Sequence, residues 1–291
     1  MTTYTIYNEF LTVKVESLGA QLKSIKTKDG TEYLWQGDDR YWSDRALNIF
    51  PYVARLYGGK YKLYGKEYNM NIHGFAWTSE FSLVKQDETS LTLSLCENDD
   101  TLKQYPYKFN FSITYILKGN KLLTIYYIEN KNDKTMYFGL GGHPGFNIPL
   151  GNDGVFEDYR LRFDESCAPV RIGFTPDCFL NGEDNEYPLT DNVINLRHEL
   201  FDDDAIVLKN IPKKVTLESV SGSRAVTVEY PGMDYLGIWH APKTDAPYVC
   251  IEPWCSLPSF TGKTAVFENQ KDLLSLNAYE SYENSWSITV K

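Results

Sequence analysis

Hydrophobic and polar residues alternate with a period of two in many short stretches of the chain, a pattern that predicts β-strands. Residues 12–16 (TVKVE) and 91–95 (LTLSL) alternate strictly, while 109–117 (FNFSITYIL) and 122–128 (LLTIYYI) are rich in β-branched and aromatic residues. The short turn at 119–121 (GNK) between the last two predicts a β-hairpin. Further short strands are predicted at 215–218, 225–230, 248–251 and 285–290.

Helical signals are few. A short helix is predicted over 191–200 (DNVINLRHEL), with Asp191 as its N-cap, and another turn or two over 99–105. No long helices alternate with the strands, so the pattern does not fit a parallel sheet with crossover helices. Many short strands with few helices predict an all-β protein built as a sandwich of antiparallel sheets. No long linker interrupts the pattern, and residues 1–291 are predicted to form a single domain.

Composition and charge narrow the classes of partner. The net charge of −10 disfavours nucleic acid and anionic membranes, which would repel an acidic chain. No run of about 18 apolar residues is present to span a bilayer, and the start of the chain lacks the pattern of a signal peptide, so a cytoplasmic location is expected. The five cysteines are widely spaced without a CxxC pair, which predicts free thiols rather than disulfides or a zinc knuckle.

Two segments in the first third of the chain break the strand pattern with polar residues. Arg55 lies among apolar and aromatic neighbours just before a Gly-Gly turn. It is either a surface arginine at a strand end or a fork of N–H donors for the oxygens of a ligand. His73 precedes a glycine that permits a backbone bend. The alternative for His73 is a hydrogen-bonded structural histidine.

Two later segments supply the residue types that acid/base chemistry needs. The glycine-rich stretch 139–147 (GLGGHPGFN) is predicted to be a shaped loop, rather than an ordinary strand, that presents His143. In 249–254 (VCIEPW) an apolar run ends at Glu252, and Pro253 is expected to end the strand ladder. Burial would raise the pKa of Glu252, which suits a general base. The alternatives are an incidental histidine in a tight turn and an exposed glutamate at a strand end.

Five landmarks follow one another from about residue 5 to about residue 290. They are Gly19-Ala20, Arg55 with Gly58-Gly59, the His-Gly of NIHGFAW (71–77), GGHPGFN (141–147) and the Glu-Pro-Trp of IEPWCSLPSF (251–260). With these landmarks the chain resembles the galactose mutarotase-like superfamily, and most closely the LacX-type branch of the aldose 1-epimerase family. The resemblance implies a large antiparallel β-supersandwich with a sugar site in its concave cleft.

The resemblance also implies roles in the interconversion of the α and β anomers of a hexose. Glu252 matches the general base that takes the proton of the C1 hydroxyl, and His143 matches the general acid that protonates the ring oxygen. His73 and Arg55 match groups that bind sugar oxygens and hydroxyls. No metal or other cofactor is implied.

The resemblance also implies an aspartate that binds the substrate, but it does not assign this role to a single residue. Family members carry it in a segment like Asp-His-x-Phe-x-Leu, and the comparable stretch here is 201–208 (FDDDAIVL), which lacks the Asp-His pair. Aligning the apolar tail favours Asp203, while Asp202 and Asp204 stay open. This departure leaves the identity of the sugar open.

Other readings stay open from the sequence. The same scaffold could bind or sense a sugar without catalysis. A metal-dependent enzyme would have to gather ligands without a recognised spacing, from His73, His143, His240 and Glu252. A hexose 6-phosphate would need basic groups near the cleft. The candidates for those groups are Arg45, Arg55 and Lys60.

The sequence also supports three further expectations, for His240, for four tryptophans and for the oligomeric state. His240 ends a β-rich run and is a candidate for the rim of the cleft. Four tryptophans, which core packing would also explain, could form a stacking wall for a sugar. They are Trp35, Trp77, Trp239 and Trp254. Aromatic-rich β surfaces can also pair with one another, so a homodimer is one option.

Overall fold

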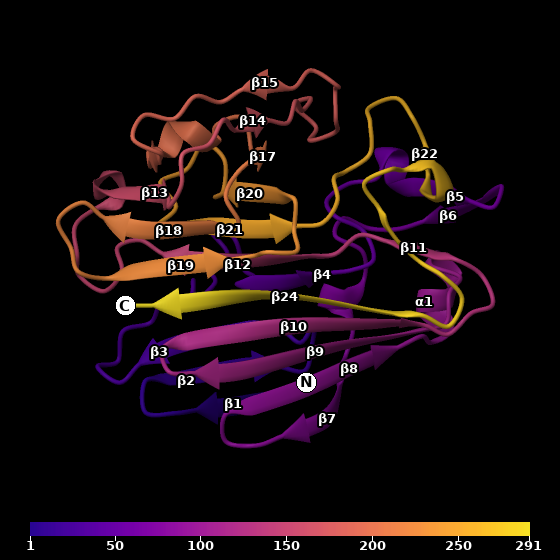
Figure 1. Ribbon diagram of the computed structural model, residues 1–291, viewed down its shortest axis with the longest axis horizontal. Helices are drawn as coiled ribbons and strands as arrows, with labels where there is room; N and C mark the ends of the chain where they lie inside the picture. The colour runs from indigo at the N-terminus through magenta and orange to yellow at the C-terminus, as the bar shows by residue number, and fades with distance from the viewer.

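The computed structural model describes residues 1–291, and most of its regular structure is antiparallel sheet (Figure 1). The prediction of an all-β fold with few short helices is therefore confirmed. The largest sheet has nine strands. In spatial order they are β16 (Val193–Asn195), β13 (Tyr159–Phe163), β18 (Lys214–Ser219), β19 (Ala225–Glu229), β24 (Ser281–Val290), β10 (Lys121–Asn130), β9 (Phe109–Lys118), β8 (Ser90–Cys96) and β7 (Ser82–Gln86).

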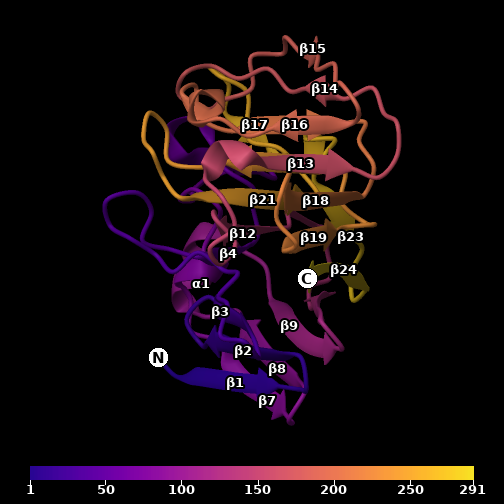
Figure 2. The ribbon, with the colours of Figure 1, turned by 90° about the vertical axis from the view of Figure 1, so that its left-hand side faces the viewer.

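A second sheet of seven strands carries the residues of greatest chemical interest. In spatial order its strands are β15 (Asn185–Glu186), β14 (Val170–Arg171), β17 (Ile206–Lys209), β20 (Tyr235–Trp239), β21 (Tyr248–Trp254), β12 (Gly141–Asn147) and β4 (Ala46–Ile49). Figure 2 shows β17 and β21 behind β13 and β18, so the two sheets form two layers in that half of the molecule. One connected core of 65 buried residues includes side chains from both sheets.

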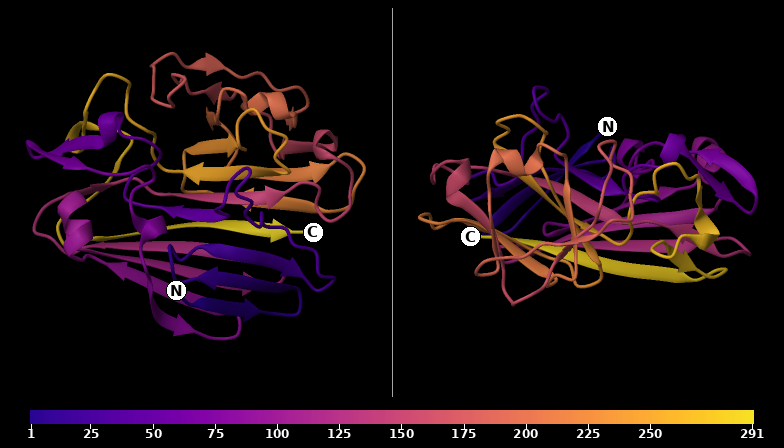
Figure 3. Two further views of the ribbon diagram at one scale, coloured as in Figure 1. Left: turned by 180° about the vertical axis from the view of Figure 1, so that it is seen from behind. Right: turned by 90° about the horizontal axis from the view of Figure 1, so that it is seen from above.

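Smaller sheets and short helices complete the chain. A three-stranded sheet of β1 (Thr3–Tyr7), β2 (Leu11–Glu16) and β3 (Leu22–Thr27) contacts β8 and β4 and lies beside β7–β9 in Figures 2 and 3. The remaining strands are β22 (Ala265–Val266), β5 (Lys60–Leu63) and β6 (Lys66–Asn69) in one sheet, and β11 (Met136–Phe138) with β23 (Leu274–Leu276) in another. The helices are α1 (Asp99–Gln104) and the 3₁₀ turns η1 (Tyr57–Gly59), η2 (Ala76–Thr78), η3 (Phe156–Asp158), η4 (His198–Phe201) and η5 (Phe267–Asn269).

Local sequence signals explain the elements that were predicted. The hairpin at 119–121 joins β9 to β10, and Gly119 takes the positive φ of +60° that the tight turn requires. Helix α1 begins after Asn98, whose side chain accepts hydrogen bonds from two backbone N–H groups of the first turn. All of the short strands that alternation predicted are present.

The helix predicted over 191–200 is wrong. Asp191 and Asn192 take positive φ angles of 54° and 58°, which turn the chain, and Val193–Asn195 then pair with β13. Ile194 is buried, and residue 196 is buried again, as the period of a strand requires. Within 191–200 only the last three residues take a helical form, as part of η4. The apolar spacing of this short segment fits both periods, and pairing with the neighbouring strand decides between them.

Candidate active site

A single row of residues crosses five strands of the seven-stranded sheet and forms the floor of the site. Leu47 of β4 pairs with His143 of β12, and the constant register between β12 and β21 places His143 opposite Glu252. Glu252 pairs with Gly237 of β20, which in turn pairs with Val207 of β17. Because paired residues of neighbouring strands point to the same face of a sheet, these five residues face one side together.

A cavity of about 270 Å³ opens above this row. This volume lies near the lower end of small-molecule sites, which suits a ligand the size of one sugar ring. Apolar and aromatic side chains make up most of the lining, together with a few convergent polar groups. The polar groups are Asp44, Arg55, His73, His143, Asp203, Asp204 and Glu252.

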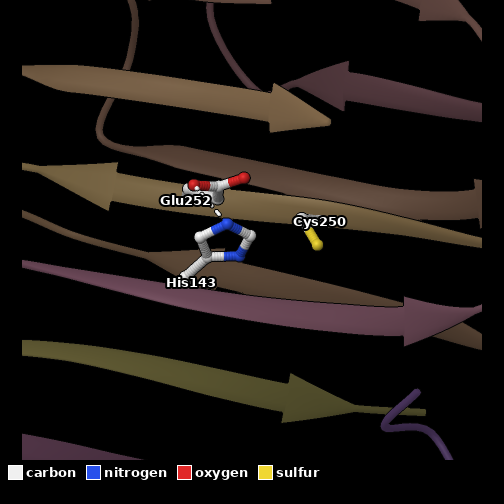
Figure 4. Close-up of side chains that lie close together, drawn as sticks. All are labelled: His143, Cys250 and Glu252. Carbon is white, nitrogen blue, oxygen red and sulfur yellow. Dashed lines mark ion pairs between the residues drawn. The ribbon is translucent and has the colours of Figure 1, made fainter. Parts of the chain in front are cut away.

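His143 and Glu252 form a buried pair at the bottom of this first cavity. The Nε2 atom of His143 lies 3.3 Å from Oε2 of Glu252. A dashed line marks this pair in Figure 4. The two residues are 7% and 2% exposed. At this distance a proton can pass between them directly, and both groups can reach one small molecule in the cavity.

Burial pushes the proton affinities of the two groups in opposite directions. Desolvation, with a contribution from the nearby Asp204 carboxylate, raises the pKa of Glu252 well above its ordinary value. Desolvation, with a contribution from His73, lowers the pKa of His143 well below its ordinary value. The pair therefore holds one proton over a wide range of pH, because a second proton and the loss of the first are both unfavourable.

Aromatic rings hold the His143 imidazole in place. The Trp42 ring stacks on it with ring centroids 4.8 Å apart, and the Trp239 ring meets it edge-on at 5.7 Å. The Nδ1 atom of His143 is buried and has no hydrogen-bond partner. Trp42 did not emerge from the sequence reasoning, because it lies in an irregular segment 101 residues before the histidine that it covers.

The stretch around His143 is a strand, and the prediction of a loop there was wrong. Gly141–Asn147 form β12, paired on both sides. Its glycines serve close packing instead of a turn: a Cβ atom on Gly142 would lie 2.7 Å from the Trp286 ring, and one on Gly145 would lie 3.1 Å from the Trp42 ring. Glycine is therefore needed where large rings approach the strand backbone.

Glu252 also lies inside a strand rather than at its end. β21 continues through Pro253 to Trp254, which pairs with Gly141 on one side and Tyr235 on the other. The expectation that Pro253 would end the ladder was wrong. A proline removes only one N–H donor, and the neighbouring residues keep the strand paired.

His73 adds a neutral donor to the cavity wall. Its Nδ1 atom accepts a hydrogen bond from the backbone N–H of Ala54 at 3.2 Å, so the ring hydrogen of the neutral form is on Nε2. Burial, with a smaller effect of Arg55, lowers the pKa of His73 to about 3. Gly74 beside it has φ +72°, and a Cβ atom there would lie 2.3 Å from the Phe50 carbonyl oxygen. The glycine therefore permits the bend that points His73 inward.

Arg55 lines the cavity and is exposed, without a salt bridge to any carboxylate of the chain. Its backbone is fixed, because its carbonyl oxygen accepts a hydrogen bond from the N–H of Ser259 at 3.0 Å. A guanidinium held at the mouth of a cavity with unused N–H groups can bind ligand oxygens.

The three consecutive aspartates take different positions. Asp203 and Asp204 line the first cavity, whereas Asp202 does not. Asp203 is exposed, and Asp204 is half-buried with φ +74°. The Asp204 carboxylate accepts a hydrogen bond from the Cys178 thiol at 2.9 Å, and burial together with this carboxylate raises the pKa of Cys178 to about 12. Cys178 was not among the residues predicted from sequence.

Several residues considered from sequence do not join the site. His240 is fully buried, is hydrogen-bonded to His198 at 3.1 Å and does not line the cavity, so its expected place at the rim was wrong. Arg45 and Lys60 do not line it either.

The residues that could hold a metal ion are His143, Cys250 and Glu252, which Figure 4 shows together. Their ligand atoms lie within 4.8 Å of one another.

Of the four tryptophans considered as a stacking wall, three line the first cavity and one packs on a tyrosine ring. Trp77, Trp239 and Trp254 line the first cavity, whereas Trp35 stacks on Tyr248 with ring centroids 4.6 Å apart. The Gly19 of the early Gly-Ala pair supports the cavity indirectly. A Cβ atom on it would lie 2.6 Å from the carbonyl oxygen of Trp77, so glycine allows this close approach.

No helix in the structure is long and apolar enough to cross a membrane.

Comparison with known proteins places this chain in a family. The chain matches the sequence family described as Aldose 1-epimerase over residues 2–289. It is 32% identical to the chromosomal protein LacX of Lactococcus lactis subsp. lactis over 299 aligned residues, with 99% of each chain covered.

Solved structures agree with the sequence match. The galactose mutarotase related enzyme from Lactobacillus acidophilus has a TM-score of 0.94 and 33% identity, over 100% of this chain and 97% of that chain. A galactose mutarotase-like protein from Lactobacillus casei has a TM-score of 0.95 and 30% identity, over the full length of both chains. The chain therefore has the galactose mutarotase-like fold and belongs to the aldose 1-epimerase family of sugar isomerases.

Proposed function

We propose that this protein interconverts the α and β anomers of an uncharged hexose by general acid/base catalysis. The observation that carries the proposal is the buried pair of His143 and Glu252, 3.3 Å apart at the bottom of a cavity of sugar size. The two oxygens that must exchange protons in this reaction, the C1 hydroxyl and the ring oxygen, are bonded to the same carbon. Two protein groups that reach both oxygens must therefore lie within a few ångströms of each other.

In the proposed reaction the Glu252 carboxylate takes the proton of the C1 hydroxyl while His143 donates a proton to the ring oxygen. The bond between C1 and the ring oxygen breaks as C1 becomes a carbonyl. Rotation about the C1–C2 bond then presents the other face of the carbonyl to the ring hydroxyl. Closure reverses both proton transfers, so each group ends as it began.

The pair can reach the required charge state without a change in its proton count. Burial favours a neutral carboxylic acid beside a neutral imidazole. The reactive state, a carboxylate beside an imidazolium, differs only in which group holds the shared proton. Sugar oxygens can stabilise this state, because hydrogen bonds to charged groups are stronger than those between neutral groups.

The remaining polar groups are proposed to hold the sugar hydroxyls. Arg55 and the Nε2–H of His73 donate hydrogen bonds, and Asp203 and Asp204 accept them. Trp77, Trp239 and Trp254 offer apolar faces to the ring carbons. A donor and acceptor set of this kind matches a polyol, whose hydroxyls both donate and accept.

The charges of the lining favour an uncharged hexose over a hexose 6-phosphate. Apart from Glu252, which shares a proton with His143, three carboxylates line the first cavity against one guanidinium, that of Arg55. We expect the protein to accelerate anomer exchange of glucose or galactose with a kcat/KM at least tenfold higher than for the corresponding 6-phosphate, as measured by proton NMR of the anomeric signals. Faster exchange of the phosphates would contradict the choice of substrate class, whereas saturable binding without acceleration would indicate a sugar-binding module.

The proposed pair also fixes the shape of the pH profile. The active form holds one proton in all. The acid limb of the pH profile reports the gain of a second proton, and burial moves it below the ordinary pKa of an imidazole. The alkaline limb reports the loss of the only proton, and burial moves it above the ordinary pKa of a carboxyl group. We expect kcat to be bell-shaped with a broad plateau, falling in acid when the pair gains a second proton and in alkali when it loses the first.

Asp204→Asn tests the cause of the alkaline limb. This substitution removes a charge that raises the pKa of Glu252, so the alkaline limb of kcat should move to lower pH. An alkaline limb that stays in place would contradict the assignment of that limb to Glu252.

A further inference from the structure

A buried cysteine lies next to the proposed catalytic pair. Cys250 comes two residues before Glu252 on β21, so the two side chains point to the same face of the sheet. Figure 4 shows the thiol sulfur to one side of the His143 imidazole ring. The ligand atoms of the three residues lie within 4.8 Å of one another. The acid/base reaction proposed above gives the thiol no role.

The spacing of the catalytic pair fits two ligands of one metal ion. Nε2 of His143 and Oε2 of Glu252 are 3.3 Å apart. Two nitrogen or oxygen ligands of a tetrahedral zinc ion, each about 2.0–2.1 Å from it, lie about 3.3–3.4 Å from each other. A thiolate sulfur about 2.3 Å from the same ion would lie about 3.6 Å from both. A small rotation of the Cys250 side chain brings its sulfur to this distance, because the ligand atoms already lie within 4.8 Å.

Charge and burial also favour a divalent ion at this place. Glu252 is 2% exposed and Cys250 is fully buried. When the ion binds, two protons leave to water, the one that His143 and Glu252 share and the one on the thiol. The carboxylate and the thiolate then cancel the two charges of the ion. The loaded site is neutral, and burial costs a neutral site far less than an unpaired charge.

The His143 imidazole is free to offer Nε2 to the ion. Its Nδ1 atom is buried without a hydrogen-bond partner, so no neighbour fixes the tautomer of the ring. The neutral imidazole can therefore keep its one hydrogen on Nδ1 and direct the lone pair of Nε2 at the ion.

The three ligand types select among metal ions and set the position of the ion. Mg²⁺ and Ca²⁺ prefer oxygen ligands, whereas a thiolate with an imidazole favours Zn²⁺ or Co²⁺. Three protein ligands leave the fourth position of a tetrahedral ion open. His143 and Glu252 line the first cavity and Cys250 does not, so the sulfur would hold the ion from below and the open position would face the cavity. An ion held there occupies the place where the sugar reacts.

We propose that His143, Cys250 and Glu252 form an inhibitory site for Zn²⁺. The bound ion takes the carboxylate oxygen and the imidazole nitrogen that the proton transfers require. The loaded protein therefore cannot exchange anomers, and removal of the ion restores the reaction. Binding of the ion stands on the geometry of the three residues, whereas its inhibitory effect rests on the function proposed above.

Binding of Co²⁺ tests the site without any turnover of sugar. One Co²⁺ per protein should give the intense near-ultraviolet absorption of a cobalt–thiolate bond, and Zn²⁺ should displace it. The Cys250→Ala protein should lack this absorption. Cys255→Ala, the same change at another buried free cysteine, should keep it. An unmodified protein that shows no such absorption, or a folded Cys250→Ala protein that keeps it, would overturn the proposal.

Anomer exchange of glucose and galactose gives the second readout. Zn²⁺ should slow the exchange, a chelator should restore it, and Mg²⁺ should have no effect. We expect the Cys250→Ala protein to keep the rate measured without metal. It should need a Zn²⁺ concentration at least about tenfold higher for the same inhibition, because even the loss of an outer partner of a metal site costs about 10–100-fold in affinity.

The outcomes separate the metal site from the proposed function. If the unmodified protein exchanges anomers but is no more sensitive to Zn²⁺ than the Cys250→Ala protein, the proposal is wrong while the proposed function stands. If the cobalt–thiolate absorption is present but no sugar exchanges faster with the protein than without it, the metal site stands, and both its inhibitory role and the proposed function are wrong.

Discussion

Replacing Glu252 by glutamine is expected to lower kcat for hexose anomer exchange by about 10²–10⁴-fold, the usual contribution of a positioned general base. The amide has nearly the same shape as the carboxyl group but cannot take the proton of the C1 hydroxyl. Because Glu252 is 2% exposed and its charged form is disfavoured by burial, the neutral amide should not destabilise the fold. Rates from proton NMR of the anomeric signals, with thermal unfolding measured in parallel, check this expectation.

The matched control is Glu283→Gln, the same change at an exposed position of β24. It should keep the rate of the unmodified protein. A Glu252→Gln protein that is folded and retains more than about a tenth of the original kcat would show that this carboxylate is not the base.

Replacing His143 by asparagine should lower kcat by a similar factor, about 10²–10⁴-fold, because the ring oxygen then loses its proton donor. His198→Asn is the control, since His198 lies in a separate histidine contact with His240. The same NMR assay and unfolding measurement apply. KM should change less than kcat, because the proposed role of His143 is proton transfer rather than binding.

The double variant distinguishes a working pair from two independent effects. If Glu252 and His143 act together on one sugar, the loss in the double variant should be about as large as the larger single loss. Multiplied losses would mean that the two residues contribute separately, against the proposed exchange of protons through one pair.

Much of the fold could be predicted because alternation is a local signal. The strands at β2, β8, β9 and β10 alternate along their length, since each has one buried face. The hairpin over 119–121 needed only a glycine turn between two such strands. The strand order of the sheets could not be predicted, because pairing such as that of β10 with β24 joins residues far apart in the sequence.

The sequence-based predictions that were wrong concern segments where tertiary packing overrides the local preference of the chain. The glycines of β12 were taken for a loop, but large rings from other segments occupy the space beside them. The expected place of His240 was wrong for a related reason. Residues 235, 237 and 239 of β20 share the face of Glu252, so the next residue, His240, points away from it.

The candidate site was predictable only in part. His143, Glu252, His73, Arg55 and Asp203 all line one cavity, as the resemblance implied, although their roles stay predictions. Trp42 gave no signal, because an aromatic residue in an irregular segment has many uses. The single domain over 1–291, the homodimer and the cytoplasmic location also stay predictions.

The most direct measurement is the optical rotation of freshly dissolved α-D-glucose and α-D-galactose, followed with and without the protein. We expect catalytic amounts of the unmodified protein to speed the approach to equilibrium for at least one of the two sugars. We also expect Glu252→Gln and His143→Asn proteins, folded and at equal concentration, to follow the uncatalysed curve closely. An unchanged rate with the unmodified protein for both sugars, or a full rate with either variant, would contradict the central claim.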